Sequence, residues 1–103
     1  MKTYDDFKSI RGWAHARNLI QGSTTDKQFL KLIEEVGELA AGLARKDDVQ
    51  VMDGIGDAVV VLTILAEQMG FTIEACIEMA WDEIKDRKGQ MIDGVFVKEA
   101  DLV

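Results

Sequence analysis

The stretch that decides the fold is QFLKLIEEVGELAAGL, residues 28–43. Its apolar side chains recur every three or four positions, which is the spacing of residues along one face of an α-helix. The series consists of Phe29, Ile33, Val36, Leu39 or Ala40, and Leu43. Thr25, with Gln28 three residues later, resembles a capping box, so we predict an amphipathic helix that begins near Thr25.

The next segment, from about Val49 to Met69, requires a choice between strand and helix. Its centre, residues 59–65, is rich in β-branched side chains, which strand propensity alone assigns to a β-strand. Length favours a helix, because the apolar pattern from Val51 onward has no turn signal and a strand is usually ~5–6 residues long. A helix that is apolar on nearly every side has to be covered on nearly every side, by its own domain and by a second subunit.

A further helix is expected on the N-terminal side. Thr3 and Asp6 resemble another capping box, and the helix should run from about Tyr4 to Ile20, with Gly22 just past its end. Its apolar face would consist of Phe7, Ile10, Trp13 and Ala14.

A fourth helix and a short tail complete the chain. Gly70 ends the third helix and Thr72 caps the fourth, which should run to about Lys88 with Trp81 in its buried face. In residues 91–97 an Asp-Gly turn signal separates short apolar pieces, so this tail should form a small hairpin or lie on a neighbouring subunit. The sequence therefore predicts an all-α, four-helix bundle-like fold with a short C-terminal extended tail or hairpin.

Size and composition are those of an ordinary soluble protein. The chain has 103 residues, enough for a single domain over positions 1–103, and its 48% hydrophobic and 30% charged residues argue against disorder. A helical chain this short often completes its core by pairing with copies of itself, so a homodimer or homotetramer is expected. A net charge of −7 argues against a nucleic-acid polymer as partner, because phosphate backbones require a basic face.

Other features indicate a cytoplasmic protein. Residues 1–10 carry Asp5 and Asp6 and lack the apolar stretch of a secretory signal. The longest apolar run, Ala58 to Ala66, is far shorter than the ~20 residues that cross a bilayer, so no membrane association is expected. Cys76 is the only cysteine, which excludes an internal disulfide, and its apolar neighbours predict a buried side chain.

Helix-borne acids form the candidate chemical site. Glu34, Glu35 and Glu38 lie within one turn of one another, and Asp53 and Asp57 lie one turn apart on the next predicted helix. Three acids alone would be interpreted as the solvated face of an amphipathic helix, but two more acids on an antiparallel neighbour favour a site. Such hard oxygen ligands suit Mg²⁺ or Mn²⁺, whereas zinc would require histidine or cysteine.

The acidic pattern, Glu34-Glu35-x-x-Glu38 followed by Gly54-x-x-Asp57, resembles the signature E-E-x-x-E, spacer, E-x-x-D of the MazG-like nucleotide pyrophosphohydrolases. The resemblance covers the two central helices and implies an all-α, Mg²⁺-dependent enzyme. That enzyme would hydrolyse a nucleoside triphosphate to monophosphate and pyrophosphate by attack of water at the α-phosphorus. On this resemblance Glu35, Glu38 and Asp57 would bind the metal. Glu34 would position or deprotonate the water.

One position departs from the family's signature. The glutamate of E-x-x-D falls on Gly54, which has no side chain to bind a metal. Asp53, one residue earlier, is the candidate replacement ligand and would reach the metal directly or through water. Otherwise three carboxylates and an extra water would hold the ion.

Candidate substrate contacts lie on three of the helices. Lys85 and Lys88, one turn apart, would hold the β- and γ-phosphates, although cations near a helix C-terminus also favour the macrodipole without any ligand. Trp13 and Asn18 would contact the base or sugar, but a tryptophan on an apolar face is more often part of the core. Lys31 is a further candidate for substrate binding.

Two other functions compete with this one. A non-catalytic helical dimerisation or binding module would keep the fold and lose full metal ligation at Gly54. A ferritin-like di-metal oxidase would need Glu-x-x-His pairs, and the only histidine, His15, has Gly12 three residues before it. Metal-dependent hydrolysis of a triphosphate would distinguish the enzyme from the binding module.

Overall fold

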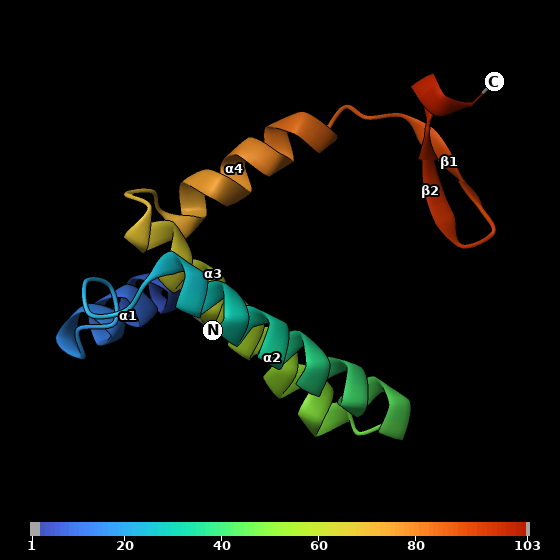
Figure 1. The fold of residues 1–103 in the computed structure, drawn as a ribbon. Coiled ribbons are helices and arrows are strands. Elements are labelled where there is room, and N and C mark those ends of the chain that lie inside the picture. The colour runs from blue at the N-terminus through green and yellow to red at the C-terminus, as the bar shows by residue number, and fades with distance from the viewer. Residues whose placement is uncertain (1–2, 103) are drawn as a thin grey trace.

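The computed structural model describes residues 3–102 and shows four helices followed by a small hairpin in that part of the chain (Figure 1). The helices are α1 (Thr3–Ala16), α2 (Thr25–Arg45), α3 (Asp48–Gln68) and α4 (Ile73–Ile84). Strands β1 (Gly89–Ile92) and β2 (Val95–Lys98) pair antiparallel, and a short 3₁₀ helix, η1 (Glu99–Asp101), follows them. The predicted all-α class with a C-terminal hairpin is confirmed.

Side-chain caps determine where α2, α3 and α4 begin. The Thr24 hydroxyl accepts a hydrogen bond from the backbone N–H of Lys27 at 3.1 Å, so Thr24 caps α2 and the prediction of Thr25 was wrong by one residue. Asp47 caps α3 in the same way. Thr72 caps α4, as the sequence predicted.

Residues with left-handed backbone follow the ends of α1, α2 and α3. They are Asn18 (φ 57°), Lys46 (φ 56°) and Gly70 (φ 83°). α1 ends at Ala16 and does not continue to Ile20 as predicted, because the N–H groups of residues 18 and 19 turn back to carbonyls inside the helix. Glycine at position 70 adopts this conformation without a steric penalty, which explains why its signal predicted the end of α3 correctly.

α4 ends at Ile84, one turn before the predicted end at Lys88. The N–H of Lys85 donates to the carbonyl of Trp81, but the carbonyl of Lys88 accepts a hydrogen bond from Glu99, beyond the hairpin, at 2.8 Å. Lys85 and Lys88 are therefore not one turn apart on a helix, which corrects the prediction.

The hairpin forms at the Asp-Gly signal. Asp93 (φ 50°) and Gly94 (φ 80°) both have positive φ, as in the two-residue turns whose twist matches antiparallel strands. Met91 pairs with Phe96 across the strands, and both side chains are exposed.

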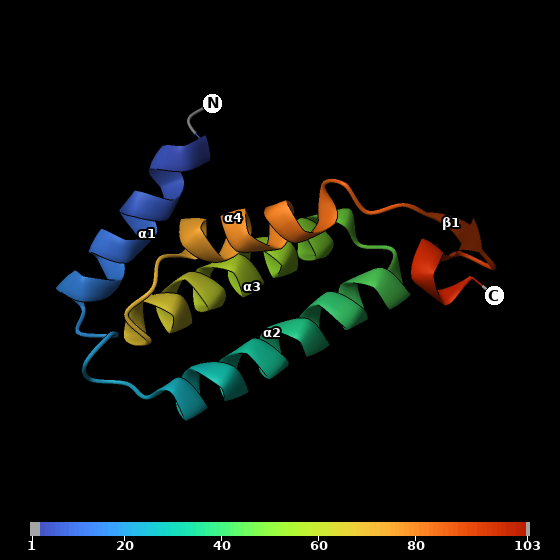
Figure 2. The ribbon, with the colours of Figure 1, turned by 90° about the horizontal axis from the view of Figure 1, so that it is seen from above.

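α2 and α3 run antiparallel and pack side by side (Figures 1 and 2). On α2 the buried residues are Gln28, Glu35 and Gly42, which recur every seventh position. Seven-residue spacing keeps one narrow face of a helix against its neighbour, as in a coiled coil. The face of α2 that packs on α3 is therefore not the apolar face that the sequence predicted. The two faces lie next to each other on the helix.

Glycines permit close contact between the two helices. A Cβ added at Gly54 would lie 3.1 Å from the Cβ of Leu39 and 3.2 Å from its Cα, and one added at Gly42 would lie 3.1 Å from Gln50. Where the helices meet, the Gln50 amide donates a hydrogen bond to the backbone carbonyl of Glu38 at 3.0 Å. This contact fixes α3 at the level of the acidic residues of α2.

Within the described residues, most of the predicted apolar face of α2 is uncovered. Phe29 and Ile33 are each 53% exposed, and Val36 and Leu43 are exposed as well. The burial that the pattern predicts is therefore absent in the single chain. Because an apolar row of this length rarely faces water, we expect a second molecule to bury this face of α2.

α4 and the hairpin extend away from the α2–α3 pair (Figure 1). The radius of gyration of 16.5 Å reflects this shape, since a compact chain of this size would have ~13 Å. Trp81 is 57% exposed and Cys76 is exposed, so the predicted burial of both was wrong for the single chain.

Two polar contacts attach α1. Arg11 forms a bidentate ion pair with Glu74 of α4, and its hydrogen bonds hold the pKa of the Glu74 carboxyl below its usual value. Nε2 of His15 lies 2.7 Å from Oε2 of Glu67 on α3. α1 is thereby held alongside α3 (Figure 2).

α3 is long and apolar enough to cross a membrane by length and composition alone, with a mean hydropathy of 1.7 in its most apolar window. The core helix of a soluble protein passes the same test, and α3 contacts each of the other three helices. Within the single chain, 28% of that window is buried. Much of its apolar surface is therefore exposed in the described residues.

The contact at Gly54 leads to a test of the helix packing. Gly54→Ala should lower the free energy of unfolding by about 1 kcal/mol or more, because overpacking against the Leu39 backbone outweighs the gain in helix propensity. Gly56→Ala is the matched control. No atom lies within 4 Å of a Cβ at that position, so this variant should gain up to ~1 kcal/mol. Urea unfolding measures both, and equal gains in the two variants would contradict the packing.

Candidate metal centre

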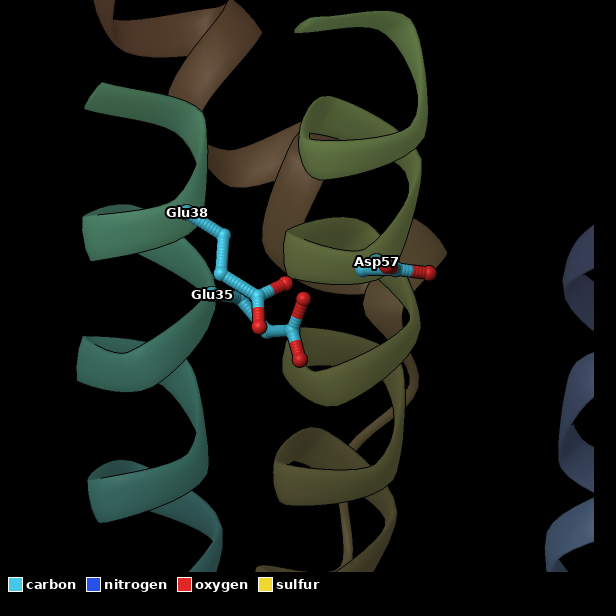
Figure 3. A group of neighbouring side chains, drawn as sticks. All are labelled: Glu35, Glu38 and Asp57. Atoms are coloured by element: carbon cyan, nitrogen blue, oxygen red, sulfur yellow. The ribbon is translucent and has the colours of Figure 1, made fainter. Parts of the chain in front are cut away.

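Three carboxylates converge where α2 packs on α3. Glu35 and Glu38 extend from α2 toward α3, and Asp57 lies on α3 at the same level (Figure 3). One ligand oxygen from each residue lies within 4.8 Å of the others. The antiparallel packing thus brings together three of the acids that the sequence singled out.

Glu35 is the most buried of the three. Its side chain is only 6% exposed, and its Oε2 is buried without a hydrogen-bond partner. Its Oε1 lies 3.3 Å from the ammonium of Lys31, a contact that raises the pKa of Lys31. A buried carboxylate oxygen without a partner is costly, and a bound cation would remove that cost.

The donors fit a hard divalent cation. Carboxylate oxygens are the ligands that Mg²⁺ and Mn²⁺ prefer, and Mg²⁺ keeps several waters beside one or two carboxylates. The group contains neither histidine nor cysteine, which zinc sites favour. The unpartnered oxygen of Glu35 is available as a ligand. These residues therefore fit the metal that the resemblance implied.

Neighbouring acids have different surroundings. Glu34 is exposed, and its Oε1 lies 3.5 Å from the same Lys31 ammonium that contacts Glu35. Asp53 is exposed and lines a cavity beside Asp57, and it is not in the group of three. Gly54 is buried in the contact with α2.

The remaining substrate candidates are not gathered at this group in the single chain. Lys85 pairs with Asp82 at 3.1 Å on the helix that leaves the α2–α3 pair, and Lys88 is in the connection to the hairpin (Figure 1). The Arg17 guanidinium lies 4.6 Å from the centroid of the Trp13 ring, and Asn18 follows the end of α1.

A cavity between α1 and α3 adds residues that the sequence reasoning did not assign to a site. It is an open groove of about 840 Å³, and it is lined by the exposed residues Asp6 and Ser9 of α1 and by Asp53 and Asp57 of α3. The sequence pattern assigned Asp6 to a helix cap. Its spacing of three residues from Ser9, on the same face of α1, is the signal that was available.

Fold and site together define an all-α protein with a carboxylate centre suited to a divalent metal, built from two antiparallel helices. A family model, the MazG nucleotide pyrophosphohydrolase domain, matches residues 23–92. The chain belongs to this family, whose members act on nucleoside triphosphates and generally depend on divalent metals. The match includes α2, α3, α4 and β1, and α1 lies outside it.

The chain is also similar to an 18.2 kDa protein of Haemophilus phage HP1 (strain HP1c1), described as uncharacterized and located in the rep–hol intergenic region. The two are 51% identical over 61 residues, which is 59% of this chain and 37% of the phage protein. The chain thus spans well under two thirds of that relative. No solved structure gives a significant match.

The carboxylate group predicts a metal-dependent change in thermal stability. Mg²⁺ or Mn²⁺ should raise the melting temperature of the wild type by several degrees, because the ion binds only the folded chain. Glu38→Gln should abolish this rise and should itself melt higher without metal, since it relieves repulsion among the acids. Glu78→Gln, in an exposed position on α4, is the control. An equal rise in wild type and Glu38→Gln would exclude the site.

Proposed function

We propose that this protein is a Mg²⁺-dependent nucleoside triphosphate pyrophosphohydrolase, which releases nucleoside monophosphate and pyrophosphate. The observation that carries the proposal is the buried, unpartnered oxygen of Glu35 within ligand distance of Glu38 and Asp57. Family membership supports the substrate class. Mn²⁺ would serve as an alternative ion, because it accepts the same oxygen ligands.

Each of these residues would have a separate role in the reaction. Glu35, Glu38 and Asp57 would hold Mg²⁺, which would neutralise charge on the phosphate oxygens. Glu34 would position the attacking water or take its proton, because its carboxylate is exposed and close to the same ammonium as Glu35. Lys31 would release these acids and contact a phosphate once the metal neutralises them.

The missing ligand at Gly54 does not argue for a non-catalytic binding module. Three carboxylates converge without any contribution from that position, and Mg²⁺ accepts water in the vacant coordination positions. Asp53, beside Asp57 on the cavity side of α3, would add a contact through water. The three carboxylates therefore support the enzyme over the binding module.

A second copy would complete the protein. The apolar face of α2 and most of α4 are uncovered in the described residues, and Lys85 and Lys88 follow α4, which extends away from the α2–α3 pair (Figure 1). We propose a homodimer or homotetramer in which these lysines reach the phosphates bound by another copy. Trp13 and Asn18 would border the nucleoside. A cytoplasmic location agrees with a nucleotide substrate.

The reaction should release pyrophosphate and not orthophosphate, because water attacks the α-phosphorus. Phosphorus NMR after incubation with each triphosphate and Mg²⁺ should show monophosphate and pyrophosphate. Glu38→Gln should lower kcat at least ~100-fold, and Glu78→Gln should leave it unchanged. Diphosphate with orthophosphate as first products, or no Mg²⁺-dependent hydrolysis of any triphosphate, would refute the proposal.

Assembly can be tested separately. Light scattering at micromolar concentration should show a dimer or larger species, because the uncovered face of α2 must be buried. Ile33→Glu should produce the monomer, since it places a charge in that face. Lys27→Glu, on the opposite side of α2, should not. An 11.5 kDa species for the wild type would contradict the assembly.

A further inference from the structure

Two side chains of α1 hold the acids on either side of the turn between α3 and α4. Arg11 and His15 are four residues apart, about one turn of α1, and therefore lie on the same face of the helix. Arg11 forms its bidentate ion pair with Glu74 in the first turn of α4. His15 contacts Glu67 in the last turn of α3. α1 thus spans the turn and connects the two helices that the turn joins (Figure 2).

The turn itself leaves little chain between the two helices. The N–H of Phe71 donates to the carbonyl of Ala66 at 2.9 Å. The N–H of Gly70 donates to the carbonyl of Glu67 at 3.0 Å, and together these bonds close the end of α3. The next residue, Thr72, already caps α4. The direction of α4 therefore depends on rotation about the few backbone bonds that join Phe71 to Thr72.

Packing against the rest of the chain does not fix that direction. In the part of the chain that the structure describes, Ile73 is the only buried residue of α4, and it lies in the first turn. Farther along the helix, Ile77, Trp81 and Ile84 are exposed. A helix joined at one end by a short turn swings about that turn, so a contact beyond the turn is required to hold it.

The pair of Arg11 and Glu74 has the geometry for this task. Two parallel hydrogen bonds between a planar guanidinium and a carboxylate fix the orientation of the partners as well as their distance. The side chains of Arg11 and Glu74 are 19% and 42% exposed, so the pair is partly shielded from water. A pair of this kind restricts the angle of α4 more than a single exposed contact would.

We propose that α1 is a brace that holds α4 at one angle to α3. The ion pair of Arg11 with Glu74 fixes the angle, and His15 anchors α1 to α3. Because Lys85 and the hairpin follow α4 in the chain, the brace also determines where they are presented. α1 lies outside the family match, so that match does not imply the brace. The inference goes beyond the proposed function and does not rest on it.

Pulsed electron paramagnetic resonance between two spin labels measures the angle. Lys27→Cys on α2 and Glu83→Cys near the end of α4 place the labels at exposed positions, in a Cys76→Ser background. Excess unlabelled protein restricts the measurement to distances within one chain. The labelled parent should give one narrow distance distribution. Arg11→Gln should broaden it by several ångströms, because α4 is 12 residues or ~18 Å long and its far end moves as a lever.

A double-mutant cycle assigns the effect to the ion pair. Glu74→Gln should broaden the distribution as Arg11→Gln does, and the double variant should be no broader than either single variant, since all three lack the same contact. Lys8→Gln is the matched control. It removes a positive charge from an exposed position one turn earlier on α1, and it should keep the parent's distribution.

Circular dichroism shows whether the helices persist in each variant, and it should give the parent's helical content in all of them. A narrow distribution in Arg11→Gln, a broad one already in the parent, or a double variant broader than both single variants would overturn the brace. A loss of helical content in Arg11→Gln would also overturn it, because the pair should orient α4 without being required for folding. These results are independent of whether the protein hydrolyses any triphosphate.

Discussion

The close packing of α2 on α3 is the constraint on which the structure depends. Gly54 lets the backbone of α3 approach Leu39 of α2, and this approach turns a narrow face of α2 inward. Glu35 lies on that face and is buried with one oxygen unpartnered. Its Oε1 pairs with Lys31, so the packing that stabilises the helix pair leaves one buried oxygen, Oε2, for a metal ion to contact.

This packing also changes the meaning of the glycine in the family's signature. From sequence, Gly54 is a lost ligand, and restoring a glutamate there would be expected to strengthen metal binding. In the structure the position faces Leu39, so a side chain there would require Leu39 to shift by a few tenths of an ångström, close to the acids of α2. Gly54 is therefore a packing residue in this chain, at the contact between α2 and α3 that also holds the carboxylate group.

Sequence reasoning predicted the elements well and their surroundings less well. Caps and glycines placed the helices to within a few residues, because these signals are local. Helical spacing and antiparallel packing predicted a group of five acids, because these rules are local, and the family resemblance selected Glu35, Glu38 and Asp57 from it. The face of α2 that packs inward was not predicted, because the apolar row beginning at Phe29 is the stronger signal, although that row is exposed in the structure. The cavity that includes Asp6 depends on how α1 lies against α3, which no local pattern encodes.

The most direct test of the account is the location of a metal ion in crystals of the protein grown with Mn²⁺. Anomalous scattering from manganese identifies the ion independently of any assumption about its ligands. The account predicts a peak bounded by the carboxylates of Glu35, Glu38 and Asp57, with Oε2 of Glu35 among the ligands. A manganese peak elsewhere, or an empty carboxylate group at a Mn²⁺ concentration that raises the melting temperature, would contradict it.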